Sequence, residues 1–159
     1  MKITHNPSNR PLNFLAAALV ASALVAAPFA LAQTAKSVPK THKIVFEMSV
    51  DGMPKWESVV RNADNLQESF GAKNTRIEIV AHGKGIGLLL GKNSVETPEL
   101  KALIQNAHQN GVVFAACNNT LTRMNIPRSD LLQIAIVVDS GVAEVVRKQE
   151  AGWTYIKSG

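Results

Sequence analysis

The chain has 159 residues, and 17 Lys and Arg against 12 Asp and Glu give it a net charge of +5. The cations that follow the first 32 residues are scattered, with Arg147 and Lys148 the only adjacent pair, which argues against a nucleic-acid-binding groove. A single cysteine, Cys117, excludes an internal disulfide, so a folded domain must be held together by its hydrophobic core. Zinc signatures are absent as well, and we expect neither a metal nor a cofactor.

The first 32 residues have the three parts of a cleavable secretory signal peptide. Lys2 and Arg10 form a positive start, Phe14–Leu31 is apolar, and Ala30-Leu31-Ala32 is a small-x-small cleavage motif. A membrane anchor is the alternative, because the apolar stretch approaches the ~20 residues that span a bilayer. The cleavage motif favours removal. We therefore expect a periplasmic or secreted protein, cleaved near Ala32 and free of the membrane afterwards.

After the signal peptide, residues 33–41 predict a flexible lead-in and residues 42–159 a single domain. Apolar and β-branched runs predict strands, and apolar residues at spacings of three and four predict helices between them. In chain order the predicted elements are a strand at Ile44–Val50, a helix at Trp56–Phe70, a strand at Thr75–Ala81, a helix at Leu100–Ala107, a strand at Val112–Cys117, a turn at Thr120–Met124, a strand at Leu131–Val138, a helix at Ser140–Gln149 and a strand at Trp153–Ile156.

Two of the helices carry clear end signals. Gly71 follows Trp56–Phe70 as a C-terminal stop. Thr97-Pro98-Glu99 precedes the second helix and supplies a capping residue, a first-turn proline and an acid near the positive helix end. Alternating strands and helices predict an α/β fold, a three-layer α/β/α sandwich with a mainly parallel sheet of about five strands.

Ligands of open parallel sheets collect at the carboxyl ends of the strands, where the sequence places Cys117 and His82. Asn118, Asn119 and Thr120 follow Cys117 and are suitable caps for a short helix, whose positive end would favour the thiolate. The alternative is that Cys117 is a small buried hydrophobe, as free cysteines commonly are.

His82 is the second candidate catalytic residue. If its strand neighbours that of Cys117, it could orient or deprotonate the thiol; otherwise it closes a turn. Asp51, Asp139, Ser140 and Glu47 have no spacing that indicates a catalytic set, and the nucleophile elbow of hydrolases is absent.

A glycine-rich stretch, Gly83–Lys92, follows the second predicted strand. It fails the P-loop template at Ile86 and Asn93 and the dinucleotide fingerprint at Leu88, so nucleotide binding is disfavoured. We interpret it as a flexible rim loop whose apolar run, Ile86–Leu90, packs on the domain or on a partner subunit, and an exposed run of this kind favours oligomerisation.

Three segments together resemble the DsrE/DsrF-like family: the opening Lys43-Ile44-Val45-Phe46 strand, the stretch from Ile79 to Leu90, and Gly111–Leu121 with its terminal cysteine and Asn-Thr-Leu turn. The likeness covers about residues 42–157. It implies an α/β/α fold, assembly into trimers or hexamers, and a link to sulfur metabolism in which some members carry sulfur as a cysteine persulfide. Cys117 matches the sulfur-bearing position, and His82 matches the rim motif more weakly.

These observations predict an exported protein that handles sulfane sulfur or thiol redox chemistry as a persulfide carrier, with Cys117 and His82 as catalytic residues. Gly83, Gly85, Asn118, Asn119 and Thr120 are the predicted ligand-binding residues. A sulfur donor or acceptor protein would be its partner, and whether transfer amounts to enzymatic turnover stays open. The alternative is a non-catalytic, oligomeric module that binds a small ligand and buries Cys117.

Overall fold

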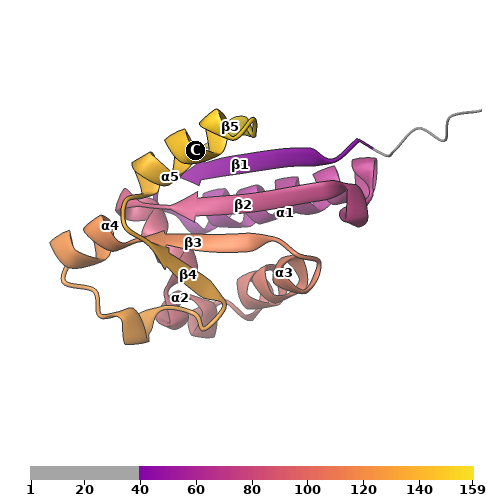
Figure 1. The fold of residues 1–159 in the computed structure, drawn as a ribbon. Coiled ribbons are helices and arrows are strands. Elements are labelled where there is room, and N and C mark those ends of the chain that lie inside the picture. Colours follow the sequence, from indigo (N-terminus) through magenta and orange to yellow (C-terminus); the bar gives the residue numbers. More distant parts are fainter. Residues whose placement is uncertain (1–39) are drawn as a thin grey trace, which may run out of the picture. The chain divides into compact units, whose positions relative to one another are not determined.

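Five parallel strands form the centre of residues 40–159, the part of the chain that the computed structural model describes, with only the backbone described at residues 94–96. The strand order is β4-β3-β2-β1-β5 (Figure 1). The predicted signal peptide and most of the lead-in lie outside the described residues. The strands are β1 His42–Met48, β2 Thr75–Ala81, β3 Val113–Cys117, β4 Ala135–Val138 and β5 Thr154–Ser158.

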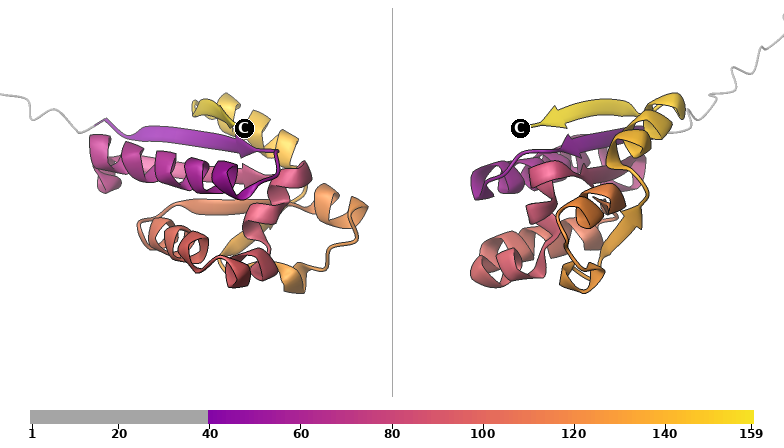
Figure 2. Two further views of the ribbon diagram at one scale, coloured as in Figure 1. Left: turned by 180° about the vertical axis from the view of Figure 1, so that it is seen from behind. Right: turned by 90° about the vertical axis from the view of Figure 1, so that its left-hand side faces the viewer.

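Helices cover both faces of this sheet, with α1 and α3 on one face and α5 on the other (Figure 2). The predicted three-layer sandwich is confirmed, and the sheet is wholly parallel. None of the helices in the described part is long and apolar enough to cross a membrane. The helices are α1 Met53–Phe70, α2 Gly91–Glu96, α3 Pro98–Gln109, α4 Asn118–Arg123 and α5 Gly141–Glu150, and the 3₁₀ segments are η1 Ala72–Asn74, η2 Gly83–Leu89 and η3 Arg128–Asp130.

The two faces of the sheet bury unequal amounts of apolar side chain. Strand residues alternate between faces, and the main apolar core, which includes Phe46, Ile79 and Phe114, lies between the sheet and helices α1 and α3. The α5 face holds a much smaller cluster around Val80 and Val145. Because each fully buried large apolar side chain contributes about 1.5–3 kcal/mol, the α1 and α3 face carries most of the folding energy. The α5 face can therefore hold polar side chains.

The helix end signals are confirmed in part. Helix α1 ends at Phe70, and Gly71 follows it with a φ of 85°, a conformation that favours glycine. Helix α3 begins at Pro98 as expected. Thr97 occupies the capping position, but its side chain makes no capping hydrogen bond. The proline and the acid in the first turn, Glu99, are thus the signals that hold for this helix start.

The glycine-rich stretch packs its apolar run on the domain, which confirms one of the two predicted alternatives, whereas the predictions of a flexible loop and of an exposed run are wrong. It folds into η2 and the start of α2, and Ile86, Leu88 and Leu89 are buried in the chain's own core. Glycines make this close packing feasible: a Cβ on Gly85 would lie 2.2 Å from the Met48 carbonyl oxygen. The apolar run therefore leaves no surface for a partner.

Two predicted strands differ from the observed ones in extent. Strand β1 starts and ends two residues early, at His42 and Met48, and the Met48 carbonyl accepts from the His82 N–H at 3.0 Å. Strand β4 lacks the first half of its predicted range. Leu131 instead forms an antiparallel bridge with Leu90, and Leu132 donates to the Leu89 carbonyl oxygen at 2.9 Å. The residues that were predicted to begin β4 therefore pair with the end of η2 and with Leu90 instead of with β3.

A buried ion pair fastens α5 to the sheet. Glu78 on β2 is only 3% exposed, and its Oε2 lies 2.5 Å from Lys148 Nζ. Lys148 also lies 3.4 Å from Glu144 Oε1 and 4.5 Å from the centre of the Trp153 ring. Burial raises the pKa of Glu78 more than Lys148 lowers it, and Glu144 raises it further. The Glu78 carboxylate at neutral pH therefore depends on Lys148.

Replacing Lys148 with Met should lower the free energy of unfolding by about 3 kcal/mol at neutral pH, because it leaves the buried Glu78 carboxylate unpaired. Glu78 binds a proton more readily in the folded chain than in the unfolded one, so the penalty should shrink as the pH falls through the raised pKa of Glu78. Urea unfolding at a series of pH values measures this. Lys101→Met, at an exposed position on α3, is the matched control. A penalty that is constant with pH would contradict the assignment.

Candidate functional site

The structure brings Cys117 and His82 together at the carboxyl edge of the sheet. Strands β2 and β3 are neighbours, and Ala81 pairs with Ala116, so the residues that follow this pair lie side by side. Gly141, the first residue of α5, sits against both. A Cβ on Gly141 would lie 3.0 Å from the Cβ of His82 and 3.2 Å from the Cβ of Cys117. The condition that the sequence left open, adjacency of the two strands, is therefore met.

Hydrogen-bond donors surround the Cys117 sulfur, which belongs to a residue only 5% exposed. The Thr120 N–H donates to Sγ at 3.4 Å, and the Thr120 hydroxyl and the Gly141 and Asn119 N–H groups also stabilise the anion. Burial raises the pKa of the Cys117 thiol, but these donors together lower the pKa by more than burial raises it. The pKa of the thiol therefore lies below its ordinary value. A thiolate is the nucleophilic form of cysteine.

Helix α4 begins at the thiol itself. Cys117 is the N-cap residue, and its sulfur takes the place of the usual capping oxygen. This corrects the expectation that the polar residues after Cys117 cap the helix: Asn118 is already the first helical residue. Helix α5 begins beside the same sulfur, at Gly141, with Ser140 as a conventional cap that accepts from the Ala143 N–H at 3.4 Å. Two helix starts therefore meet at Cys117.

Thr120 joins the two strand ends. Thr120 is 1% exposed, its hydroxyl oxygen accepts from the Gly83 N–H at 3.0 Å, and the same hydroxyl is among the groups that lower the pKa of the Cys117 thiol. Gly83 has a φ of 51°, a backbone conformation that directs the chain from His82 into η2. The hydroxyl thus connects the segment after β2 to the thiol at the end of β3.

His82 is held by a carboxylate. Its Nε2 lies 2.8 Å from Glu47 Oε1, and the Tyr155 hydroxyl donates to Glu47 Oε2. Burial raises the pKa of Glu47, but the hydrogen bonds from Tyr155 and His82 lower it more, and the net direction is downward. Glu47 raises the pKa of Tyr155 to about 12. Among the described residues no hydrogen bond joins His82 to Cys117.

Sequence reasoning missed three of these participants. It found no catalytic spacing for Glu47, and it gave Gly141 and Tyr155 no role. A signal for Glu47 was present, because it is the one acidic residue in an otherwise apolar stretch of β1. Gly141 contributes a backbone N–H and the lack of a side chain, and neither can be recognised without knowing where α5 begins.

The predicted ligand-binding residues all lie at this edge, and several of their polar groups have partners within the chain. Asn118 Oδ1 accepts from Arg128 at 2.7 Å, the Asn119 N–H donates to the Asp139 carbonyl oxygen at 3.2 Å, and the Gly85 N–H donates to the His82 carbonyl oxygen at 3.0 Å. Like those of Thr120 and Gly83, these contacts position the site. Ligand binding by these residues stays a prediction.

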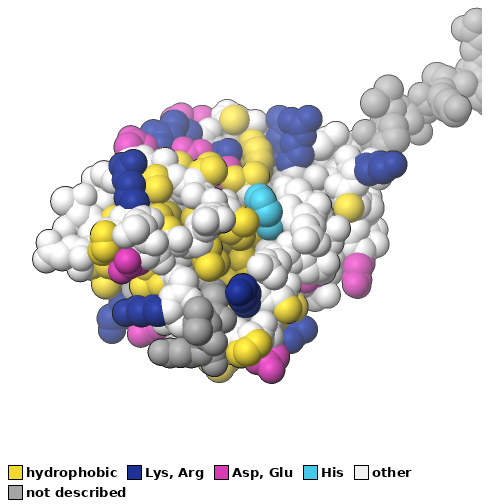
Figure 3. All heavy atoms as spheres, turned by 90° about the horizontal axis from the view of Figure 1, so that it is seen from below, with side chains coloured by type: hydrophobic (Ala, Val, Ile, Leu, Met, Phe, Trp, Pro, Cys, Tyr) yellow, Lys and Arg dark blue, Asp and Glu magenta, His cyan; other side chains and the backbone are white. Residues whose placement is uncertain are grey.

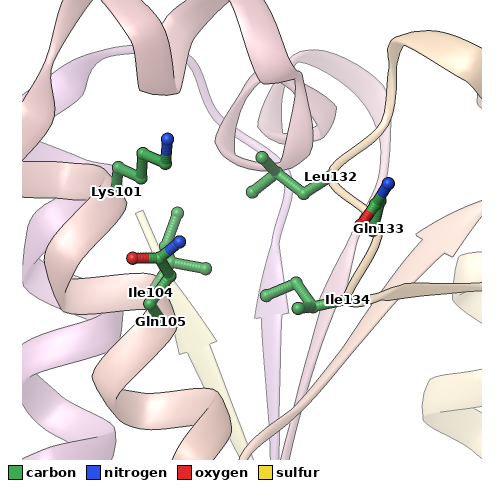
Figure 4. A pocket seen from close by; sticks show the side chains of 6 residues that line it. All are labelled: Lys101, Ile104, Gln105, Leu132, Gln133 and Ile134. Atoms are coloured by element: carbon green, nitrogen blue, oxygen red, sulfur yellow. The ribbon is translucent and has the colours of Figure 1, made fainter.

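Residues 40–159 contain no group of three or more His, Cys, Asp and Glu side chains that could hold a metal ion. A hollow of about 320 Å³ lies away from Cys117, between α3 and the segment before β4 (Figure 4). It is lined by Lys101, Ile104, Gln105, Leu132, Gln133 and Ile134. Hydrophobic side chains also gather on the face of the molecule that Figure 3 shows. On the edge strand β4, Ile136 is 49% exposed.

The site defines an α/β/α protein with a single, donor-stabilised cysteine at the carboxyl edge of its sheet. The model of the DsrE/DsrF-like family matches residues 28–158. The chain belongs to that family.

Two solved structures resemble the chain. MTH1491, a protein of unknown function from Methanobacterium thermoautotrophicum, is 32% identical with a TM-score of 0.66, over 73% of this chain and 98% of its own. BT1422, a conserved protein of unknown function from Bacteroides thetaiotaomicron, is 14% identical with a TM-score of 0.53, over 72% of this chain and 93% of its own, and supports the fold alone. No curated protein is significantly similar to the chain.

Replacing Thr120 with Val should raise the pKa of the Cys117 thiol, because the substitution removes the hydroxyl that donates to the sulfur. It should also cost about 1 kcal/mol of stability, because the partly buried Gly83 N–H loses its acceptor. The pH dependence of alkylation by a small reagent and urea unfolding measure the two effects. Thr122→Val, at an exposed position of α4, is the control and should change neither. An unchanged alkylation profile in Thr120→Val would contradict the role of the hydroxyl.

Proposed function

We propose that this protein accepts sulfane sulfur on Cys117 and carries it as a persulfide. The observation that carries the proposal is the set of donors from Thr120, Gly141 and Asn119 that lowers the pKa of the Cys117 thiol. Membership of the DsrE/DsrF-like family supports a role related to sulfur relay. The same donors would stabilise the negative charge of a persulfide anion.

The transfer needs no external oxidant or reductant. The Cys117 thiolate attacks the terminal sulfur of a donor R–S–SH, a new S–S bond forms, and the original S–S bond breaks with its electron pair leaving on R–S⁻. A proton then converts R–S⁻ to R–SH. The products are the Cys117 persulfide and a free thiol, and an acceptor thiolate would later remove the sulfur by the same exchange in reverse.

The burial of Cys117 indicates which reagents reach it. A 5% exposed thiol is accessible to a slim persulfide or polysulfide chain more readily than to a bulky reagent. We therefore propose that the donor presents a terminal sulfur on a flexible group, as a small-molecule persulfide or a persulfidated chain end of a partner protein does.

The cellular setting is also a proposal. The signal-like residues 1–32 support export to the periplasm or the exterior, where a thiol without an intramolecular partner must persist under oxidising conditions. Assembly into a homo-oligomer, a trimer or hexamer, is supported by the edge strand β4 with its exposed Ile136.

A hollow of about 520 Å³ favours the alternative, a non-catalytic binding module. Lys84 and Lys92 line it together with Asp51 and Asp130, so the hollow offers both charges to a small polar ligand. In that case burial of Cys117 would be structural.

Mature protein treated with a small persulfide donor should gain the mass of one sulfur atom, and the gain should map to Cys117. The donor-stabilised thiolate is the reason to expect reaction at neutral pH. Intact-mass spectrometry with peptide mapping measures the gain, and reduction with a thiol should remove it. Cys117→Ser is the matched control and should gain nothing. A Cys117 that stays unmodified and resists alkylation until the protein is denatured would contradict the proposal and support the binding module.

A further inference from the structure

A chain of three polar side chains crosses the α5 face of the sheet towards Cys117. Tyr155 on β5 donates to Glu47 on β1, and Glu47 Oε1 lies 2.8 Å from Nε2 of His82, which follows β2. Strands β5, β1 and β2 are consecutive in the sheet, so each link joins neighbouring strands. The chain of contacts ends where His82 and Cys117 flank Gly141.

The position of Glu47 in this chain of contacts makes its carboxylate depend on hydrogen-bond partners. Glu47 lies between Phe46 and Met48, which are both fully buried, and its side chain is only 19% exposed. A carboxylate in such a position loses hydration, and an apolar residue there would extend the small α5-face core at less cost. Tyr155 is 36% exposed and contributes little to that core. The hydrogen bonds from Tyr155 and His82 outweigh the loss of hydration and hold the pKa of Glu47 below its ordinary value, so a charged carboxylate is kept beside His82.

The contact with Glu47 determines which nitrogen of His82 is available. A carboxylate accepts hydrogen bonds, so Nε2 carries a hydrogen and donates it to Glu47 Oε1. The other nitrogen, Nδ1, is bonded to the ring carbon that bears Cβ, and the Cβ atoms of His82 and Cys117 both lie against Gly141. With Nε2 held by Glu47, Nδ1 is the ring nitrogen that remains available for proton transfer at this edge of the sheet.

We propose that Glu47 and Tyr155 are positioning residues that hold His82 so that its Nδ1 delivers the proton to the thiol released when Cys117 accepts sulfur. This inference rests on the proposed function. It adds the group that carries the proton and the two residues that orient it.

The step balances without an added reductant. Protonated His82 and the Cys117 thiolate meet the donor R–S–SH; the Cys117 sulfur bonds to the terminal sulfur, the donor S–S bond breaks, and its electron pair leaves on the R–S sulfur. Nδ1 of His82 gives its proton to that sulfur, so the products are the Cys117 persulfide, R–SH and neutral His82. The reverse sequence returns the proton to His82 when an acceptor thiol removes the sulfur.

The first test follows the His82 ring itself in full-length mature protein labelled with nitrogen-15 histidine. Wild-type protein at a pH where His82 is neutral should show Nε2 protonated and Nδ1 bare, and Glu47→Gln should convert this to a mixture of the two tautomers. Glu144→Gln is the matched control, because Glu144 lies on the same face but pairs with Arg147 and Lys148. An unchanged His82 signal in Glu47→Gln would overturn the inference.

The second test measures single-turnover sulfur transfer from persulfides whose parent thiols differ in acidity. A proton donor matters most when the leaving thiolate is strongly basic. Glu47→Gln should therefore slow the least acidic donors on the order of a hundredfold and the most acidic ones little, and Tyr155→Phe should show the same trend more weakly. Glu144→Gln should follow wild type.

The outcomes separate the two proposals. A uniform loss of rate across all donors in Glu47→Gln and Tyr155→Phe would show a merely structural role and overturn the inference. A wild-type protein that takes no sulfur at Cys117 would instead overturn the proposed function, while the nitrogen signals of His82 would still decide whether Glu47 orients the ring. Tyr155→Phe removes only one hydroxyl from a partly exposed side chain, so it keeps the test valid if Glu47→Gln does not fold.

Discussion

The buried Thr120 hydroxyl is the contact on which the site depends. Its oxygen accepts from the Gly83 N–H, and the same hydroxyl is among the groups that lower the pKa of the Cys117 thiol, so one group fixes the start of η2 and stabilises the thiolate. Since η2 places Ile86 in the main core, the path of the chain after β2 is held from both sides, by packing and by this hydrogen bond. A thiol is thereby kept in a fixed, donor-rich environment although it is almost fully buried.

The unequal faces of the sheet explain why such a site is tolerated. The core beneath α1 and α3 provides most of the apolar burial, so the α5 face can hold Glu47, Glu78 and His82 at a cost that the domain sustains. Each of these groups has a specific partner: Lys148 for Glu78, and Glu47 for His82. The apolar burial beneath α1 and α3 thus offsets the free-energy cost of the polar groups on the α5 face and at the edge that holds Cys117.

The pattern of apolar residues predicted the fold well because the longer helices bury one regular face, whereas the central strands β2 and β3 are nearly continuous apolar runs buried on both faces. The rule that parallel strands present their carboxyl ends together predicted that His82 and Cys117 share one edge of the sheet. Whether their strands are neighbours was left open by the sequence, and the pairing of β2 with β3 shows that they are. Predictions failed where a tertiary contact overrode a local pattern. The apolar run from Ile86 to Leu90 looked exposed because its burial depends on the close approach of Gly85 to Met48, a contact between distant residues.

The site was predicted less completely than the fold for a similar reason. Cys117 and Thr120 are recognisable as site residues because one ends a predicted strand and the other follows it closely in the sequence. Gly141, in contrast, comes to the thiol from a segment far along the chain. Glu47 and Tyr155 come from the first and last strands, which only the sheet order brings together. A carboxylate that acts through a histidine leaves no local spacing in the sequence.

The most direct test of the central claim is a pH titration of the thiolate absorbance of the folded protein, compared with the same chain unfolded in urea. The chain has one cysteine and one tyrosine, and in the folded protein the pKa of Tyr155 is raised to about 12, so the thiolate signal there belongs to Cys117 and is well separated. In the unfolded chain a Tyr155→Phe variant removes the tyrosinate signal. We expect the folded midpoint to lie below the unfolded one, because the donors around the sulfur outweigh its burial. A folded midpoint at or above that of the unfolded chain would contradict a cysteine held ready to accept sulfur.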